Sequence, residues 1–282
     1  MIPRLLTLIL LAGCTIVEAG RASPKLYWID AQGETNLIQR SNLDGTSVES
    51  LVVGGIAGAR GLALDLTGGK MYWVTRDSDR IQRASLDGTN VEDLVAAGLD
   101  SAYGLALDLA DGKMYWTDYG TNRIQRANLD GSQIEDLVTA GLQGIRGLAL
   151  DLTARKMYWV DRGTDKVQRA NLDGSQVEDL IASGLVEPYG IALDLAANTM
   201  YVADAGTGKI IAADLGGANV RDFIPVTGGP HPAFMELDLF ERKLYWGDNR
   251  VNKIFRADLD GKNIVEIVPS GLAGPRGIAL AR

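Results

Sequence analysis

The stretch that decides the fold is KMYWTD, residues 113–118. Close variants recur along the chain, with Tyr at positions 27, 72, 115, 158, 201 and 245, a step of 43 to 45 residues. The six copies are KLYWID (25–30), KMYWVT (70–75), KMYWTD (113–118), KMYWVD (156–161), TMYVAD (199–204) and KLYWGD (243–248). All five Trp residues lie in these copies. A fixed period of this length indicates a repeat architecture in which each copy is one supersecondary unit.

Three further segments follow each copy, typified by IQRANLDG (124–131), IEDLV (134–138) and RGLALDL (146–152). They are short, apolar at alternate positions and bounded by turn-forming residues, which is the pattern of β-strands. Pairs such as Asp130-Gly131 and Gly68-Gly69 suit tight hairpins, because Gly adopts positive φ without a steric penalty. Four strands joined by hairpins and repeated at this period are typical of a propeller blade. We therefore predict an all-β fold over residues 25–282: a six-bladed β-propeller of four-stranded antiparallel blades.

The two ends of the repeat region predict how the ring closes. Residues 25–30 read as the second strand of a blade with no inner strand before them, and residues 276–280 (RGIAL) read as an inner strand with no second strand after them. We expect the C-terminal strand to complete the first blade, which removes the open edges of its sheet. On this interpretation residue 282 is a natural end of the chain.

The composition excludes several classes of protein. The 34 Gly residues are explained by hairpin turns and by the Gly that opens each GLALDL-type strand. A single Cys excludes an internal disulfide framework, and a single His, His231, excludes a His-pair zinc site. The net charge of −8 disfavours nucleic acid as a partner. We expect no cofactor and no bound metal.

Residues 1–19 read as a secretory signal. Arg4 precedes an apolar run over residues 5–13, which is too short to span a bilayer. Residues 11–14 (LAGC) resemble a lipobox with Cys14 as the lipidated residue, whereas residues 17–19 (VEA) suit ordinary signal peptidase, and Cys14 in an apolar stretch by chance is the third alternative. We favour the lipoprotein, with residues 20–24 as a short tether. The protein is then extracytoplasmic, secreted or lipid-anchored to the cell envelope, and it meets the membrane only through the lipid.

The segment YWTD at 115–118, with IQRANLDG after it and IRGLALDL next, resembles the YWTD (class B) repeat of the low-density lipoprotein receptor family. The resemblance covers residues 25–282. It implies a six-bladed propeller, extracellular placement and protein binding rather than catalysis. Receptors of that family flank the propeller with cysteine-rich modules, which this chain lacks. We therefore expect a free-standing prokaryotic relative, and a monomer.

The repeated residues read first as architecture. Large aromatic rings are expected to fill the gaps between neighbouring sheets. These residues are Tyr27, Trp28, Tyr72, Trp73, Tyr115, Trp116, Tyr158, Trp159, Tyr201, Tyr245 and Trp246. Asp118 and Asp161 are expected to accept hydrogen bonds from Arg126 and Arg169 of the next strand. The repetition of these residues favours a structural role, because an enzyme needs a catalytic group only once, whereas every blade needs a side chain that packs against its neighbour.

A binding site is expected where the copies differ. The loops that enter the innermost strands and the loops that follow the second strands meet on one face of a propeller, around its channel. The first loops carry Arg60, Tyr103, Arg146, Tyr189, Phe234 and Arg276, and the second carry Arg76, Asp77, Tyr119, Arg162, Ala205 and Asn249. Arg and aromatic residues are typical of binding hot spots, and the resemblance implies that this face takes peptides or small protein domains. The predicted ligand-binding residues are Arg60, Tyr103, Tyr119, Arg146, Arg162, Tyr189, Phe234 and Arg276. The alternative is that these side chains are solvated or only shield the channel mouth.

The fifth repeat departs most, with Val202 in place of Trp and Ala212 in place of Arg. In the strand that follows, Glu236 stands where five copies have Ala. One interpretation is that Glu236, with Phe234 and Met235 beside it, refills the space left by the smaller Val202. The other is a functional carboxylate near the channel with His231 close by, because a buried unpaired carboxylate is costly.

Six-bladed propellers also include metal-dependent hydrolases and lyases, so the fold does not decide the function. Such enzymes converge Glu, Asn, Asp or His on one metal at the channel mouth, whereas the corresponding positions here are mostly Arg, Tyr and Phe. No nucleophile has a base beside it in the sequence pattern. We predict a non-catalytic, extracytoplasmic protein- or peptide-binding propeller. The alternatives are an envelope scaffold without a discrete ligand and, less favoured, a metal-dependent propeller hydrolase or lyase.

Overall fold

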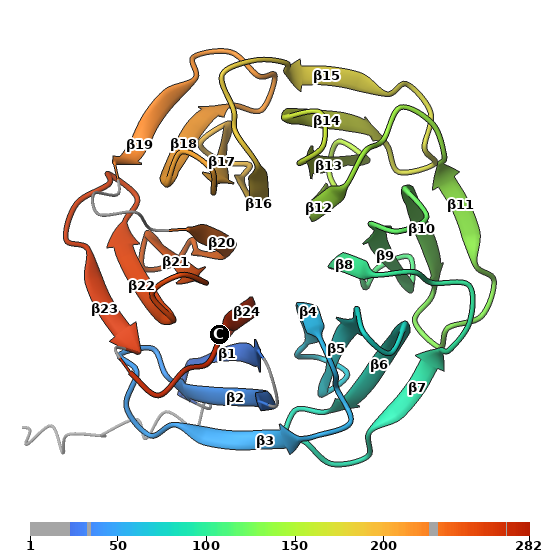
Figure 1. Ribbon diagram of the computed structural model, residues 1–282, viewed down its shortest axis with the longest axis vertical. Helices are drawn as coiled ribbons and strands as arrows, with labels where there is room; N and C mark the ends of the chain where they lie inside the picture. The colour runs from blue at the N-terminus through green and yellow to red at the C-terminus, as the bar shows by residue number, and fades with distance from the viewer. Residues whose placement is uncertain (1–22, 33–34, 226–230, 269) are drawn as a thin grey trace, which may run out of the picture.

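The computed structural model describes residues 23–32, 35–225, 231–268 and 270–282. These residues form six four-stranded antiparallel sheets arranged as blades round a central channel (Figure 1). The predicted six-bladed β-propeller is therefore confirmed. The expected signal segment, its Cys14 and most of the tether lie outside the described residues.

Each blade from the second to the sixth consists of four consecutive strands, whereas the first combines the last strand of the chain with the first three. From the innermost strand outward the blades are β24 (Pro275–Ala281), β1 (Lys25–Gln32), β2 (Thr35–Asn42) and β3 (Glu49–Val53); β4 (Ala59–Asp65), β5 (Lys70–Thr75), β6 (Arg80–Ser85) and β7 (Glu92–Val95); β8 (Ala102–Asp108), β9 (Lys113–Asp118), β10 (Arg123–Asn128) and β11 (Glu135–Val138); β12 (Ile145–Asp151), β13 (Lys156–Asp161), β14 (Lys166–Asn171) and β15 (Glu178–Ile181); β16 (Pro188–Asp194), β17 (Thr199–Asp204), β18 (Lys209–Asp214) and β19 (Arg221–Pro225); and β20 (Pro232–Asp238), β21 (Lys243–Asp248), β22 (Lys253–Asp258) and β23 (Val265–Val268).

The ring closes as predicted. Strand β24 pairs antiparallel with β1, so that Leu280 lies opposite Leu26 and Ile278 opposite Trp28. The first blade is thus built from both ends of the described chain. Among the described residues, no helix is long and apolar enough to cross a membrane.

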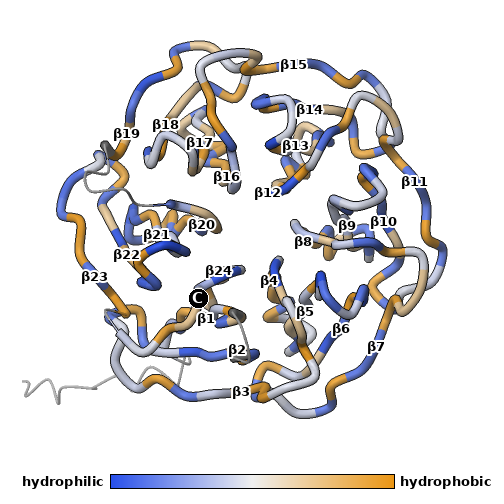
Figure 2. The backbone as a smooth tube through the Cα atoms, in the orientation of Figure 1, coloured by the Kyte–Doolittle hydropathy of each residue, from blue (hydrophilic) through white to orange (hydrophobic). Residues whose placement is uncertain are grey.

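The outer hairpins show why the Asp-Gly pairs are needed. Gly131 has φ 84°, and its amide donates to the carbonyl oxygen of Asn128 at 2.9 Å. A Cβ at Gly131 would lie 2.1 Å from the carbonyl oxygen of Leu94 in the neighbouring blade. This Gly therefore serves both the turn and the close approach between blades. Figure 2 shows hydrophilic and hydrophobic residues on each outer strand; in β7, β11 and β15 two acidic residues are followed by two aliphatic ones, and the last of these is buried.

The motif aromatics lie in the spaces between blades. Trp116 is fully buried and packs in one cluster with Tyr72 of the preceding blade and with Met114. Its indole Nε1 donates to Gln125 Oε1 at 3.1 Å, so the buried polar atom of the ring is satisfied. The other four Trp side chains are equally buried, so five of the six blades have such a ring, and the fifth has Val202 in its place.

The predicted partners of the motif aspartates are wrong. Strand β10 pairs with β9 so that Arg126 lies opposite Tyr115, and it is Arg123 that lies opposite Asp118. Arg126 instead donates to the carbonyl oxygen of Leu172 in the next blade at 3.2 Å. Asp118 accepts the backbone amides of Asp100 at 2.8 Å and Thr121 at 3.0 Å.

The second aspartate of the pair behaves in the same way. Asp161 accepts the amide of Gln143 at 2.8 Å, while Arg169 donates to the Tyr158 hydroxyl at 3.1 Å and the Leu215 carbonyl at 3.2 Å. The aspartates therefore order the loops between blades, and the arginines bridge the blades.

Candidate functional site: the mouth of the central channel

Antiparallel pairing brings the two variable loop sets to the same face. The end of β9 pairs with the start of β8, with Asp118 opposite Ala102. The amide of Tyr119, just past β9, donates to the carbonyl oxygen of Ser101, just before β8, at 3.2 Å. The same register in the other blades gathers both loop sets round one mouth of the channel, as the sequence predicts.

Three aromatic side chains form a cluster in the channel beneath this mouth. Tyr103, Tyr189 and Phe234 have exposed fractions of 3, 6 and 8% and form one buried cluster. The rings of Tyr103 and Phe234 stack with centroids 6.1 Å apart, and Tyr189 meets Phe234 edge-on at 5.6 Å. The two Tyr hydroxyls share a short hydrogen bond. These rings therefore support the mouth from below and offer a ligand little of their own surface.

Phe234 does not occupy the position that its loop suggests. In β20, Met235 pairs with Trp246, just as Leu62 pairs with Trp73 in β4. Phe234 is therefore the structural equivalent of Gly61, and Ala233 takes the place of Arg60. Its side chain lies in the channel and lines the space below the mouth.

The other inner strands carry Gly at this level because their backbones approach closely. A Cβ at Gly61 would lie 2.6 Å from the carbonyl oxygen of Tyr103, and one at Gly277 would lie 2.1 Å from that of Arg60. In the sixth inner strand, β20, a side chain is accommodated at this level, and the ring of Phe234 lies in the channel.

Two arginines lie against the aromatic cluster. The Arg146 guanidinium carbon is 3.8 Å from the centroid of the Tyr103 ring and 4.5 Å from that of Tyr119. Arg60 lies 5.7 Å from the Tyr103 centroid. Such contacts contribute about 1–2 kcal/mol when they are shielded from water. They prearrange a surface of guanidinium groups and tyrosine rings.

The cations also act on the tyrosines. Burial acts to raise the pKa of Tyr103, but the charges of Arg146 and Arg60 outweigh it and lower that pKa below its usual value. Burial raises the pKa of Tyr189. The hydrogen bond between the Tyr103 and Tyr189 hydroxyls therefore lies close to positively charged arginine side chains.

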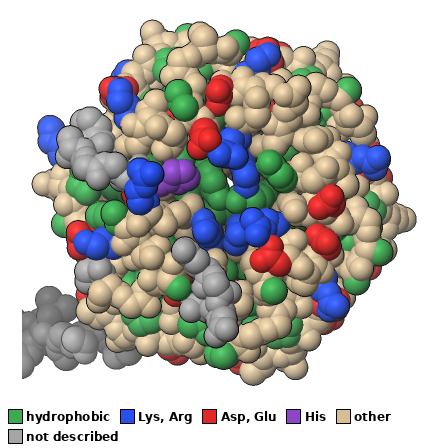
Figure 3. Space-filling model, in the orientation of Figure 1, with side chains coloured by type: hydrophobic (Ala, Val, Ile, Leu, Met, Phe, Trp, Pro, Cys, Tyr) green, Lys and Arg blue, Asp and Glu red, His purple; other side chains and the backbone are tan. Residues whose placement is uncertain are grey.

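The rim of the mouth is more accessible. Tyr119 is 38% exposed, and Arg162 donates from Nη2 to Glu187 Oε1 at 2.5 Å. Arg76 pairs with Asp77 at 2.7 Å. Figure 3 shows Lys and Arg side chains gathered round the central hollow of this face. The rim is positively charged although the chain as a whole carries a net charge of −8.

A pocket of about 430 Å³ opens at the side of the mouth, where the first and second blades meet. Its lining is polar and holds three arginines with one carboxylate. The lining residues are Ala31, Asn36, Gly58, Arg60, Arg76, Asp77, Asn249 and Arg276. Neither the pocket nor its grouping of arginines is evident from the sequence, because its walls come from three blades.

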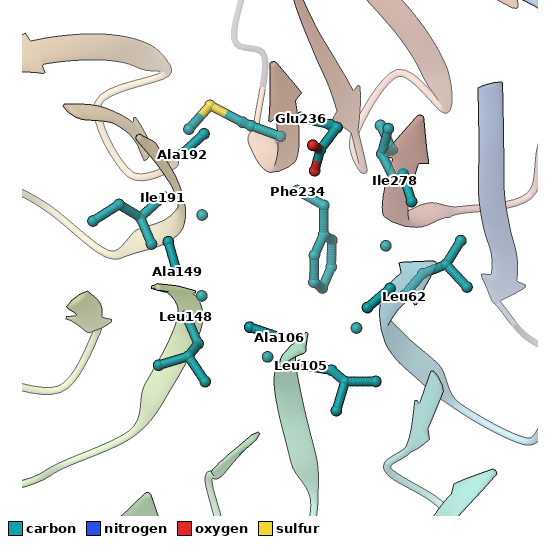
Figure 4. Close-up of a pocket in the computed structure, with 18 of the residues that line it drawn as sticks. Leu62, Leu105, Ala106, Leu148, Ala149, Ile191, Ala192, Phe234, Glu236 and Ile278 are labelled. Atoms are coloured by element: carbon teal, nitrogen blue, oxygen red, sulfur yellow. The ribbon is translucent and has the colours of Figure 1, made fainter. Parts of the chain in front are cut away.

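Below the aromatic cluster the channel widens into a cavity of about 400 Å³, lined by the inner strands. Glu236 lines this cavity, and Figure 4 shows its carboxyl group facing a space bordered by aliphatic side chains such as Leu62 and Ile278. Burial raises the pKa of Glu236 to about 7. This is the ring level at which the other inner strands carry Ala.

The space-filling interpretation of Glu236 is not supported. Val202 packs in a cluster with Tyr158 and Met200, whereas Met235 packs in another with Trp246. His231 lies edge-on against Tyr189, with centroids 5.9 Å apart, and burial lowers its pKa. A functional role for the Glu236 carboxylate stays a prediction.

Within the described part of the chain, no three His, Cys, Asp or Glu side chains lie close enough together to hold a metal ion. The side chains that the mouth presents are mainly guanidinium groups and tyrosine rings.

Comparisons with known proteins agree with this architecture. The family model for the low-density lipoprotein receptor repeat class B matches residues 112–152 and 155–195. The chain carries class B repeats. Each match runs from the second strand of one blade to the inner strand of the next, β9–β12 and then β13–β16, so the sequence repeat is offset from the blade by one strand.

A human curated protein, "Low-density lipoprotein receptor-related protein 5-like protein", is 44% identical over 54 residues, which are 19% of this chain and 21% of that protein. The match thus spans about a fifth of that relative's length. A prokaryotic origin stays a prediction.

Two solved structures share the fold. A chain in the crystal structure of a nidogen/laminin complex has a TM-score of 0.83 and 25% identity, and the match covers 92% of this chain and 98% of that one. TolB from Acinetobacter baumannii has a TM-score of 0.73 and 14% identity, over 92% of this chain and 66% of that one. The second likeness concerns the fold alone, because sequence identity is so low.

Proposed function

We propose that this protein binds a protein or peptide ligand through the channel-mouth face, outside the cytoplasm, and has no catalytic role. The observation that carries the proposal is the stack at the mouth: the Arg146 guanidinium lies between the rings of Tyr103 and Tyr119. Tyr119 is exposed while the residues beneath it are buried. An aromatic side chain held rigidly over a desolvated arginine is the arrangement found in binding hot spots.

In this proposal, some of the predicted ligand-binding residues contact the ligand and the others support them. Tyr119, Arg162 and Arg276 contact the ligand, because they are exposed or half-buried at the rim. Arg60 lies in the wall of the polar pocket beside the rim. The remaining residues hold the rim in place from below: Tyr103, Arg146, Tyr189 and Phe234.

The class B repeats and the propeller seen in a nidogen/laminin complex support protein binding as the class of function. We further propose a monomer, exported by residues 1–19 and anchored through a lipid on Cys14. Mass spectrometry of the exported protein tests the anchor: a diacylated Cys14 at the new N-terminus is expected, and a chain that starts after Ala19 contradicts it.

The binding proposal is tested by selecting peptides from a random displayed library on the immobilised full chain. We expect selected peptides to bind the Tyr119→Ala variant at least about tenfold more weakly, the loss typical of hot-spot truncation. Phe240→Ala is the matched control, because Phe240 is a 78% exposed aromatic in the turn between β20 and β21, at the opposite end of the blade. Failure to select any peptide, or equal losses in both variants, would overturn the proposal.

A further inference from the structure

The pocket at the side of the mouth has an imbalance of charge. Three of its lining residues are arginines, Arg60, Arg76 and Arg276, and its one carboxylate is Asp77. Asp77 already pairs with Arg76, whose Nε lies 2.7 Å from Oδ1. The positive charges of Arg60 and Arg276 are therefore not balanced within the lining of the pocket.

Two other arginines round the mouth have partners for their charge, although the buried Nε of Arg146 also lacks a hydrogen-bond partner. Arg162 pairs with Glu187, and Arg146 lies between the rings of Tyr103 and Tyr119. Among the described residues, no ion pair involves Arg60 or Arg276. The Nε atoms of both are buried and lack a hydrogen-bond partner.

Arg60 is built into the wall of the pocket. It is only 5% exposed, and its Nη1 donates to the neighbouring Ala59 carbonyl oxygen at 2.8 Å. That bond orients the guanidinium, while Nε–H remains unused. A buried donor without a partner is costly to leave in that state, so the site is arranged for an acceptor that the described residues do not supply.

The two cations also oppose each other. Burial lowers the pKa of Arg276, and the positive charges of Arg60 and Arg76 lower it further. An anion placed between the guanidinium groups would relieve this repulsion and satisfy the Nε–H donors together. The pocket volume of about 430 Å³ is ample for a carboxylate-bearing side chain.

We propose that this pocket binds a carboxylate of the ligand, an Asp or Glu side chain or a chain end of a peptide, through Arg60 and Arg276. The inference rests on the proposed function and deepens it. A guanidinium presents a fork of donors that matches the two oxygens of a carboxylate. The arginines converge on one pocket instead of following a track, and the net charge of −8 repels long polyanions more than one carboxylate.

The unused Nε–H groups give a direct test on the unmodified full chain. The probe is N-acetyl-aspartate methylamide, titrated at constant ionic strength while the arginine Nε–Hε NMR signals are followed. The matched control is the corresponding asparagine compound, and sodium sulfate is a third arm. We expect the signals of Arg60 and Arg276 to shift with the aspartate compound and not with the asparagine compound.

Displayed peptides test the same contact in a bound ligand. Peptides selected on the unmodified chain should share an Asp or Glu, and changing it to Asn or Gln should weaken binding about 10- to 100-fold, as expected for a charged hydrogen bond. Arg276→Gln should cause a similar loss, and the two changes together should cost little more than either alone. Arg221→Gln, on the exposed outer strand β19, is the matched control.

The outcomes separate the two proposals. Selected peptides that lose affinity with Tyr119→Ala yet carry no common acid would overturn the carboxylate pocket and leave the binding face. Signals that shift with sulfate but not with the aspartate compound would overturn it in favour of a sulfated or phosphorylated ligand. Absence of any selected peptide would overturn the binding face, while the NMR titration would still decide the pocket.

Discussion

Glu236 is expected to make the propeller less stable as the pH rises. Burial raises its pKa from the usual 4.5 to about 7 in the folded protein, so the folded state binds this proton more tightly than the unfolded state. The stability that depends on the proton is fully present below pH 4.5 and is lost as the pH rises through about 7. Since one pKa unit corresponds to about 1.36 kcal/mol, the total loss is about 3 kcal/mol.

Glu236→Gln removes the charge and keeps the shape of the side chain. We expect the variant to exceed the wild type in free energy of unfolding by about 1 kcal/mol at pH 5 and by about 3 kcal/mol at pH 8.5. Urea unfolding at both values, followed by the fluorescence of the five buried Trp residues, measures the difference.

The comparison with the wild type at each pH is essential, because other carboxyl groups act in the opposite sense. Hydrogen bonds from Thr89 lower the pKa of Asp87, for example. Glu241→Gln is the control, since Glu241 is an exposed acid that follows the same inner strand. A gain from Glu236→Gln that does not grow with pH, or no gain at all, would refute a desolvated carboxyl group in the channel.

Three further perturbations test the architecture. Trp116→Ala should lower the free energy of unfolding by about 3–5 kcal/mol, because the ring is fully buried between blades, and an urea midpoint that does not move would contradict the wedge. Gly131→Ala should lower the melting temperature, since φ is 84° and the new Cβ would lie 2.1 Å from the Leu94 carbonyl oxygen. Calorimetry measures this loss against the control Gly112→Ala, where φ is also positive but no atom lies within 4 Å of the new Cβ. A larger loss at Gly131 then reports the clash, because both variants carry the backbone strain. Removing residues 275–282 should expose the edge of β1 and cause aggregation visible by light scattering, and a monomeric folded product would argue against closure by β24.

The elements of this fold could be predicted because their signals are local. A strand needs alternating apolar residues, and a tight turn needs a residue such as Gly131 that tolerates positive φ. Repetition of these signals specified the number of blades. The wedge role of Trp116 followed as well, because a large ring that recurs in nearly every copy has to pack against something that recurs too.

The candidate site was predictable only in part. That Tyr103 and Arg146 lie at one mouth follows from strand direction, which the sequence order determines. That the Phe234 ring lies in the channel does not follow from the sequence, because β20 has the same register shift as β4 and only the packing of the inner strands shows that a side chain fits at this level. Counting back from the motif matches Asp238 with Asp65 and Phe234 with Gly61; the prediction placed Phe234 with the loop residues because it followed the aromatic side chain instead of this count.

The sequence by itself determined the repeat, the strands and the closure of the ring, since each depends on neighbours within one unit. Only the tertiary structure decided which groups meet across units. Arg126 contacts the next blade and not Asp118 because the pairing of β9 with β10 sets its opposite residue. Arg60 and Arg276, far apart in the chain, share one pocket because ring closure sets the first blade beside the second. Their lack of a partner is a property of three-dimensional packing, in which each charge is balanced by what lies near it in space.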